Sequence, residues 1–325
     1  MTVEYRHTPV MLNECRELLA LKPGESFCDC TLGGAGHALS LAEHISPNGT
    51  LLGIDQDDQA LEAASARLSQ AYPDLRTKLL KGNFGDLDSL LLQAGIPGID
   101  GILFDLGVSS HQIDNPERGF SYAADALLDF RMDPSTQNIN AAEIINTLTE
   151  ADLAWIIRTY GEERWASRIA QFIAREREKT PIATTAQLVR IIYAAIPAKA
   201  RAEGGHPAKR TFQALRIYIN NELEVLASGL EAAIRWLNPA GRIVVISYHS
   251  LEDAIVKKAF TAMRQQCLCP PDAPICTCGH VPVFSSSSKK PLVAVEAERS
   301  ANPRSKSARL RWGVKGKSGT ASICI

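Results

Sequence analysis

The sequence predicts an α/β fold built on a parallel sheet, and three observations lead to this class. Short apolar runs end in glycines or carboxylates, as at residues 27–31 and 50–55. Helix-compatible segments separate these runs, which is the alternation typical of βαβ units. A long stretch with helical periodicity, residues 141–230, precedes another buried apolar run at 241–247. The pattern therefore favours a doubly wound sheet with a helical insertion.

The first predicted strand runs into the glycine-rich segment 32–37. Glycines at such a turn let the backbone approach a ligand that any Cβ would exclude. A dinucleotide-binding loop has the spacing G-x-G-x-x-G, and no third glycine follows Gly34 and Gly36 at that spacing. The loop therefore favours a cofactor without phosphates, such as S-adenosylmethionine, over NAD. A tight turn with no ligand is the alternative.

The next predicted strands each end near a group that fits such a ligand. Asp55 lies 22 positions after Gly33, where nucleotide-binding units place a carboxylate on ribose hydroxyls. Phe84 follows the third strand, where it either packs on an adenine or belongs to the core. Asp105 ends the fourth strand, residues 100–105. Because parallel strands end at one edge of a sheet, these residues predict a ligand crevice there.

Composition and length fit a globular protein of one large or two modest domains. The chain has 325 residues, of which 45% are hydrophobic. No apolar run approaches the roughly 18 residues of a membrane span. The polar N-terminus lacks the apolar core of a signal peptide. We therefore expect a cytoplasmic protein without membrane contact.

The net charge of −1 conceals an uneven distribution of charge along the chain. Residues 1–154 hold 9 Lys and Arg against 23 Asp and Glu. Residues 155–216 hold 12 against 5, and residues 282–325 hold 9 against 2. This asymmetry suggests one surface for a small cationic cofactor and another for a polyanion. Ordinary solvated faces are the alternative for both basic segments.

The chain divides where its charge changes. Residues 111–140 are rich in loop formers, and helical periodicity follows, with Thr184 as an expected helix cap. We predict a discontinuous first domain, residues 1–112 and 217–325. Residues 113–216 form a mainly helical, inserted domain that recognises the substrate.

Cationic side chains in the insertion are candidates for nucleic-acid contacts. Lys209 and Arg210 have no acid near them in the sequence after Glu203, so phosphate binding is favoured there. Arg118 follows the predicted site strand closely and is a further RNA-binding candidate. For Arg131, a salt bridge to a neighbouring acid is an equal alternative.

Short motifs lie in order over nearly the whole chain, at residues 7–10, 31–37, 105–110, 117–121, 131–134, 247–253 and 302–304. Together they resemble one known family, the bacterial small-subunit ribosomal RNA cytosine-N4 methyltransferases. The resemblance implies a class I, Rossmann-like methyltransferase fold with an inserted helical domain. It implies S-adenosylmethionine as the cofactor and a cytidine of the 16S rRNA decoding centre, within the small ribosomal subunit, as the target. A homodimer is compatible with the sequence, which leaves the oligomeric state open.

Carried over by motif position, the family's cofactor contacts fall on Ala35, Gly36, His37, Asp55, Phe84, Asp105 and Gln112. Ala35 stands where many members have glycine, and a backbone contact tolerates that change. A lone histidine is more often structural, and its place in the glycine loop is what makes His37 a candidate.

The implied reaction transfers a methyl group from a sulfonium to an exocyclic amine. The enzyme must align this poor nucleophile and accept an N–H hydrogen bond from it. DNA amino-methyltransferases use an Asp/Asn/Ser-Pro-Pro-aromatic motif for this step, whereas this chain has Asp105 followed by Leu-Gly-Val. The acceptor therefore stays open between Asp105, as the candidate catalytic residue, Ser109, Ser110 and a backbone carbonyl.

Eight cysteines without a secretion signal favour reduced thiols. Cys28 and Cys30 alternate on a strand and are expected in the core. Four more cysteines lie close together, at Cys267, Cys269, Cys276 and Cys278. Their C-x-C spacing departs from the usual C-x₂-C of zinc sites, so no metal ligand is predicted, and a zinc site and a flexible substrate loop both stay open.

Two other classes of function compete with an RNA methyltransferase. A nicotinamide oxidoreductase requires a dehydrogenase-type loop, which the glycine spacing lacks. A non-catalytic RNA-binding assembly factor on the same scaffold would have degenerate cofactor residues, whereas Gly36, Asp55 and Asp105 are all present.

Overall fold

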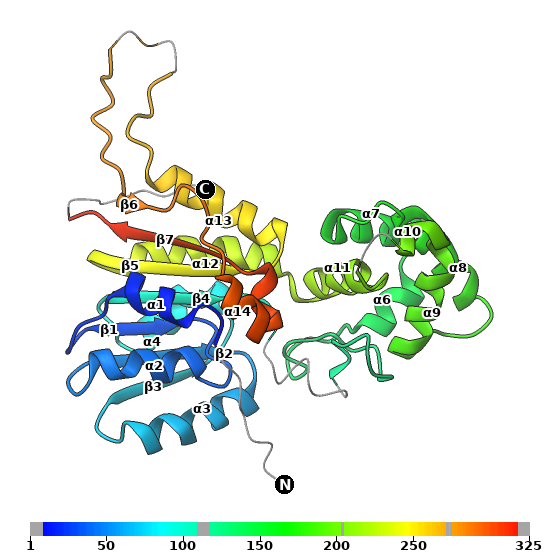
Figure 1. Ribbon diagram of the computed structural model, residues 1–325, viewed down its shortest axis with the longest axis horizontal. Helices are drawn as coiled ribbons and strands as arrows, with labels where there is room; N and C mark the ends of the chain where they lie inside the picture. Colours follow the sequence, from blue (N-terminus) through cyan, green and yellow to red (C-terminus); the bar gives the residue numbers. More distant parts are fainter. Residues whose placement is uncertain (1–8, 109–117, 203–204, 271–272, 274, 318–325) are drawn as a thin grey trace. The chain divides into compact units, whose positions relative to one another are not determined.

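The computed structural model describes residues 9–108, 118–202, 205–270, 273 and 275–317. The chain forms two compact units (Figure 1). The first unit comprises Met1–Gly107 and Leu223–Ile325, and the second comprises Val108–Glu222.

The first unit contains a seven-stranded sheet in the order β3-β2-β1-β4-β5-β7-β6. Its strands are β1 Ser26–Asp29, β2 Thr50–Asp55, β3 Arg76–Lys81, β4 Ile99–Asp105, β5 Leu237–Ser247, β6 Phe284–Ser287 and β7 Arg309–Lys315. Strands β1 to β5 pair in parallel, whereas β7 is antiparallel to both β5 and β6. The predicted parallel α/β sheet is confirmed.

Helices cover both faces of this sheet (Figure 1). One apolar layer packs under α1 Leu12–Leu19, α2 Gly36–Ile45 and α3 Asp58–Ala71. The opposite layer packs under α4 Leu87–Gln93, α12 Glu222–Trp236 and α13 Ser250–Met263. Because β1, β2 and β4 are buried on both faces, their sequences are almost continuously apolar.

The second unit is helical and has its own core, which contains Leu153, Ile169, Leu188 and Leu215. Its helices are α6 Ala141–Thr147, α7 Glu150–Gly161, α8 Ala166–Arg177, α9 Thr185–Ala195, α10 Ala198–Ala202 and α11 Lys209–Asn220. Thr184 caps α9 as predicted, in a capping box with Gln187. No helix among the described residues is long and apolar enough to span a bilayer.

Sequence patterns did not reveal the last two strands. Strand β7 carries Arg309 and Arg311, which do not match a buried strand by residue type. Arg311 is nevertheless only 4% exposed, because its guanidinium donates to both carboxylate oxygens of Asp253 in α13, at 2.7 and 3.1 Å. The Asp253 carboxylate, from a distant part of the chain, therefore pairs with Arg311 and allows this arginine to be buried in β7.

The remaining short helices belong to the first unit. They are η1 Phe84–Asp86, α14 Glu296–Ala301 and η3 Pro303–Ser307. Asn302 caps η3 through a 3.3 Å hydrogen bond from the Arg304 amide.

Candidate functional site

The glycine loop joins β1 to α2 at the carboxyl-terminal edge of the sheet. Gly33 and Ala35 both have positive φ, of 47° and 60°, a conformation that favours glycine. The Leu32 amide donates to the carbonyl of Ile54 at 3.0 Å. The Arg67 guanidinium in α3 donates to the carbonyl of Gly34. Two neighbouring elements therefore fix the path of this loop.

Gly36 is required by the protein's own packing. A Cβ added at this position would lie 2.8 Å from Cγ of Pro9, closer than carbon atoms approach without displacement. Pro9 belongs to the N-terminal motif of residues 7–10. Pro9 therefore packs against the start of α2, a role that the sequence pattern did not reveal.

Asp55 ends β2, and its carboxylate contacts two backbone amides. Oδ2 accepts a hydrogen bond from Gly33 at 2.8 Å, and Oδ1 accepts one from Asp57 at 2.9 Å. Burial raises the pKa of this carboxyl, and the two amides oppose the rise. Each oxygen retains a second lone pair, so the carboxylate can hold the loop and still accept hydrogen bonds from a ligand diol.

Asp105 ends β4, and side chains from other elements orient its carboxylate. The Tyr248 hydroxyl donates to Oδ1 at 2.6 Å. Oδ2 lies 3.4 Å from Nε2 of His37. The Asp105 amide donates to Oγ1 of Thr31 at 2.7 Å. The structure thus brings together the predicted residues His37 and Asp105 and adds Tyr248 to them.

His37 lies in the first turn of α2 with its ring almost fully buried. Neither ring nitrogen makes a hydrogen bond of good geometry among the described residues, and the Cys15 thiol is the other polar neighbour of the ring. Burial opposes protonation of His37, but Asp105 and Cys15 favour it and hold its pKa above the ordinary range. The direction of this pKa shift favours the protonated His37 ring beside the Asp105 carboxylate.

Tyr248 is a site residue to which sequence reasoning gave no role. It directly follows β5, the strand beside β4. This position at the end of a strand was the sequence signal that could have identified Tyr248 as a site residue. Glu252 accepts a hydrogen bond from the Tyr248 amide at 2.7 Å and also closes the capping box of α13 with His249. Burial and the charge of Asp105 raise the pKa of the Tyr248 hydroxyl. Tyr248 therefore acts as a hydrogen-bond donor and not as a base.

Asp29 is a second residue that the sequence reasoning missed. It ends β1, is 1% exposed, and accepts a hydrogen bond from the Thr31 amide at 3.1 Å. Burial raises its pKa to about 6, and the charges of Asp105 and Asp55 add to the rise. Three carboxylates therefore influence one another at this edge, which suits a cationic ligand.

Phe84 lies in η1, directly after the loop that follows β3. Its ring packs edge-on against Phe104, with centroids 5.4 Å apart. A Cβ added at Gly229 in α12 would lie 2.7 Å from the Phe84 ring. The ring is half-buried at the margin of the core. Packing on an adenine is compatible with this position and stays a prediction.

The residues at this edge fit S-adenosylmethionine. A backbone loop lies at the amino end of α2, Asp55 offers acceptors for a ribose diol, and the clustered carboxylates match an ammonium and a sulfonium. The other predicted candidates Ser109, Ser110 and Gln112 lie outside the described residues.

The second unit contains a separate, basic pocket of about 310 Å³. Its cationic lining residues are Arg164, Arg201, Lys209 and Arg210. The buried Glu163 also lines this pocket. The fold therefore places an acid in the same pocket as Lys209 and Arg210, which the sequence around these two residues did not show. Nε1 of Trp165 is buried and has no hydrogen-bond partner among the described residues.

Lys209 and Arg210 begin α11, and both side chains are exposed. Nη1 of Arg210 donates to the carbonyl of Glu162 at 3.0 Å. No hydrogen bond or ion pair is found for the Lys209 ammonium within the described part of the chain. Lys209 therefore keeps its charge available for a ligand.

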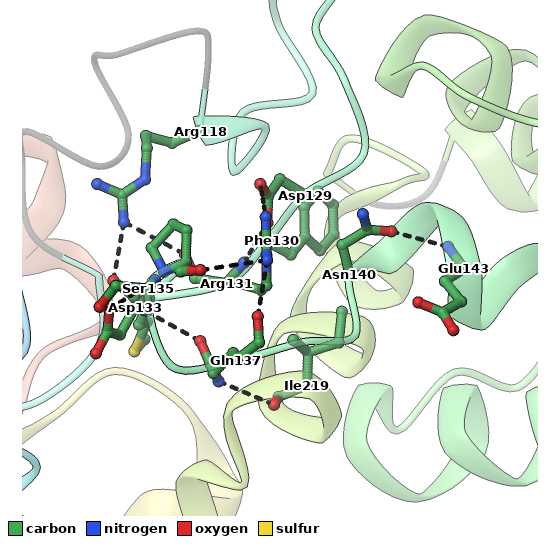
Figure 2. A network of polar contacts seen from close by, with 12 residues as sticks. Arg118, Asp129, Phe130, Arg131, Asp133, Ser135, Gln137, Asn140, Glu143 and Ile219 are labelled. Atoms are coloured by element: carbon green, nitrogen blue, oxygen red, sulfur yellow. Dashed lines mark hydrogen bonds and ion pairs between the residues drawn. The ribbon is translucent and has the colours of Figure 1, made fainter.

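Arg118 and Arg131 both make hydrogen bonds to other groups of the loop before α6 (Figure 2). Nε and Nη2 of Arg131 donate to the two carboxylate oxygens of Asp129, at 2.6 and 2.8 Å. The salt-bridge alternative for Arg131 is thus confirmed. Arg118 donates to the carbonyl of Met132 at 2.9 Å, which folds the loop before α6. An RNA contact of Arg118 stays a prediction.

Comparisons with known proteins identify the class and the family. The doubly wound sheet, with a glycine loop and clustered carboxylates at its carboxyl-terminal edge, has the Rossmann-like fold of S-adenosylmethionine-dependent methyltransferases. The chain belongs to the MraW methylase family, whose family model matches residues 4–315. Membership of a methylase family supports the predicted cofactor and counts against a nicotinamide oxidoreductase.

Relatives about 50% identical to this chain align with it over nearly their whole length. One relative, Ribosomal RNA small subunit methyltransferase H of Symbiobacterium thermophilum, is 53% identical over 315 residues, covering 97% of this chain and 98% of its own. The protein of that name from Geotalea daltonii is 52% identical over 308 residues, covering 95% and 98%. Among solved structures, TrmN from Thermus thermophilus aligns with a TM-score of 0.42 at 12% identity, covering 96% of this chain and 51% of TrmN.

Proposed function

We propose that this protein transfers the methyl group of S-adenosylmethionine to the N4 amine of a cytidine in the decoding centre of 16S rRNA, in the cytoplasm. Relatives about 50% identical over nearly the full chain are named small-subunit rRNA methyltransferases, which supports the substrate. The observation that carries the chemistry is the Asp105 carboxylate, which Tyr248 and His37 orient at the ligand edge of the sheet.

Bound S-adenosylmethionine supplies an activated methyl group on a sulfonium. The backbone of Ala35 and Gly36 would line its site, and Asp55 would accept hydrogen bonds from the ribose hydroxyls. Phe84 would contact the adenine. Tyr248 fixes the Asp105 carboxylate with His37 beside it, so a cationic ligand would meet a preorganised acceptor.

Asp105 is the proposed acceptor for the reacting amine. The N4 lone pair is delocalised into the pyrimidine, so the nitrogen must become tetrahedral as it attacks, and an acceptor for its N–H favours that change. Tyr248 donates to Oδ1 and His37 lies beside Oδ2, so each oxygen retains a second lone pair that can accept from the amine. The cytidine must leave its stack to reach a position at the sheet edge.

The second unit is proposed to recognise the RNA, with residues 113–216 as its functional part. The pocket around Lys209 and Arg210 combines cationic side chains with the indole N–H of Trp165. Cations neutralise phosphates, and aromatic rings and N–H donors contact unpaired bases. Arg118 is proposed as a further RNA contact, in addition to its bond with the loop carbonyl.

Mass mapping of rRNA nucleosides tests this function. Small-subunit rRNA from cells with and without the gene is digested, and methylated cytidines are located by fragment mass. We expect one N4-methylated cytidine in the decoding centre that disappears without the protein and returns with the wild-type chain. Return of the modification with Asp105→Asn at wild-type level, or loss of a modification on a different base, would contradict the proposal.

A further inference from the structure

A cysteine cluster lies in the first unit, in the segment between α13 and β6. Figure 1 shows this segment extending away from both elements as two long legs. Cys267 and Cys269 lie on the first leg, and Cys276 and Cys278 lie on the second. The methyl-transfer chemistry uses none of them.

The four sulfur atoms have the spacing of ligands around a single ion. The Sγ of Cys267 lies 3.4 Å from that of Cys276 and 3.8 Å from that of Cys278. The Sγ atoms of Cys276 and Cys278 are 3.6 Å apart, and all four sulfurs lie within 4.8 Å of one another. Tetrahedral coordination with zinc–sulfur bonds of about 2.3 Å places sulfurs about 3.8 Å apart.

Backbone amides donate to the sulfurs from the first leg. The amide of Leu268, between the first pair of cysteines, donates to Sγ of Cys278 at 3.4 Å. The amide of Cys269 donates to Sγ of Cys267, also at 3.4 Å. Gly279 follows with a φ of 59°, which lets the chain turn after the second pair. Amide donors of this kind stabilise the negative charge of thiolates, the form that binds metals.

Packing and disulfide formation do not explain this cluster. Cys28 and Cys30 are buried in the core, as predicted, whereas Cys276 and Cys278 are exposed and the other two only partly covered. A disulfide requires a sulfur–sulfur distance of about 2.05 Å, and the four are free thiols. Exposed thiols without a ligand are a liability that surfaces usually avoid.

We propose that Cys267, Cys269, Cys276 and Cys278 bind one Zn²⁺ as a tetrathiolate site that cross-links the two legs of the 264–283 segment. Four thiolates in a tetrahedron fill the coordination sphere of zinc, which is typical of structural sites and leaves no position for a reacting water. Leu268, Ile275 and Val281 are each more than half exposed, so these parts of the legs lack a core and the ion would supply the cohesion that a core supplies elsewhere.

Metal content of the full-length protein tests the site. The protein is purified without chelators or a histidine tag, and bound metals are measured by mass spectrometry. We expect about one zinc per chain, falling to roughly a tenth or less in the double variant Cys276→Ser/Cys278→Ser. Ile275→Ser is the matched control, because Ile275 is exposed on the same leg and offers no ligand; it should retain its zinc.

Cobalt substitution gives a second, independent readout. Replacing the zinc by Co²⁺ should produce the visible absorption of a tetrahedral thiolate complex in the wild type and Ile275→Ser, and not in the double cysteine variant. Wild-type protein that takes up neither ion when either is supplied during refolding under reducing conditions would overturn the proposal. Zinc retained at full level by the double cysteine variant would also overturn it. Neither readout depends on the RNA substrate.

Discussion

The sheet edge of the first unit and the basic pocket of the second unit hold their charged side chains in different ways. At the sheet edge, His37 is buried, Asp55 and Asp105 are partly buried, and a short hydrogen bond to Oδ1 of Asp105 and another to Oδ2 of Asp55 fix the two carboxylates. In the pocket, Lys209 and Arg210 are exposed. A site that aligns reacting atoms requires preorganisation, whereas attraction of a polyanion acts over longer distances and tolerates mobile side chains. Substitutions should therefore have large, local effects at the edge and small, cumulative effects in the pocket.

The largest expected effect is that of Asp105→Asn on methyl transfer. This variant keeps the shape of the side chain but removes the charge that orients the amine. The rate should fall roughly 10²- to 10⁴-fold, the range for positioned proton-handling groups. Single-turnover rates at saturating cofactor and RNA measure this step. The fold should persist, because the carboxylate lies at the edge of the core.

Cofactor affinity separates the two roles open to Asp105. If the carboxylate instead binds the ammonium of the cofactor, the variant should show weaker cofactor binding and an almost normal rate at saturation. Wild-type rate together with wild-type affinity would remove Asp105 from the mechanism and turn attention to Ser109 and Ser110.

The next effect in size is that of Asp55→Ala on cofactor binding. The loss of charge-assisted hydrogen bonds to the ribose should cost about 1.5–3 kcal/mol, roughly a 10- to 150-fold weaker affinity. Asp55→Asn is the matched variant, because it retains an acceptor for the Gly33 amide and should lose less. Calorimetry with S-adenosylmethionine and with NAD measures both variants. Equal or tighter binding of NAD by the wild type would refute the cofactor assignment.

Asp29→Asn tests the cost of burying charge at the sheet edge. The folded carboxyl has a pKa of about 6, above its ordinary value of 3.8. Between these values the unfolded chain has released the proton and the folded chain retains it, so stability falls as pH rises through this window. The variant lacks this penalty and should gain up to about 3 kcal/mol at pH 7.5, and little at pH 4.

Calorimetric melting of the cofactor-free protein at both pH values measures the Asp29→Asn effect. Because the chain has two units, the transition assigned to the first unit must be compared. Lys209→Ala is the control from the exposed pocket and should melt like the wild type at both pH values. An equal gain at pH 4 and pH 7.5 would show that the benefit does not come from the buried charge.

The smallest effects per residue are expected in the basic pocket. Lys209→Ala and Arg210→Ala should each weaken RNA binding and reduce the salt slope by about one unit for each phosphate that is no longer neutralised. Lys209 should follow this expectation more closely, since Arg210 also holds the Glu162 carbonyl. RNA titrations at several salt concentrations measure both, with calorimetry of S-adenosylmethionine, which should not change, as the control. Unaltered affinity and slope would mark the pocket as a solvated face.

Several features of the fold and site were predictable because they depend on local sequence. Glycines after a strand, carboxylates at the ends of apolar runs and the Thr184 cap express rules that act over a few residues. They placed the glycine loop, Asp55 and Asp105 correctly at strand ends. The resemblance of the short motifs predicted the family, and the family model that matches residues 4–315 confirms this prediction.

Only the tertiary structure decided which of these groups meet. Tyr248 reaches Asp105 across 143 positions, and Arg311 enters the core because Asp253 pairs with it. A Cβ at position 36 would collide with Pro9, which explains the glycine there. Glu163, between α7 and α8, lines the same pocket as Lys209 at the start of α11. The physical reason is that hydrogen bonding and burial depend on the distance between groups in space. The sequence by itself determines which chemical groups the strands and loops carry, and the packing of the sheet decides their partners, their exposure and hence their pKa values.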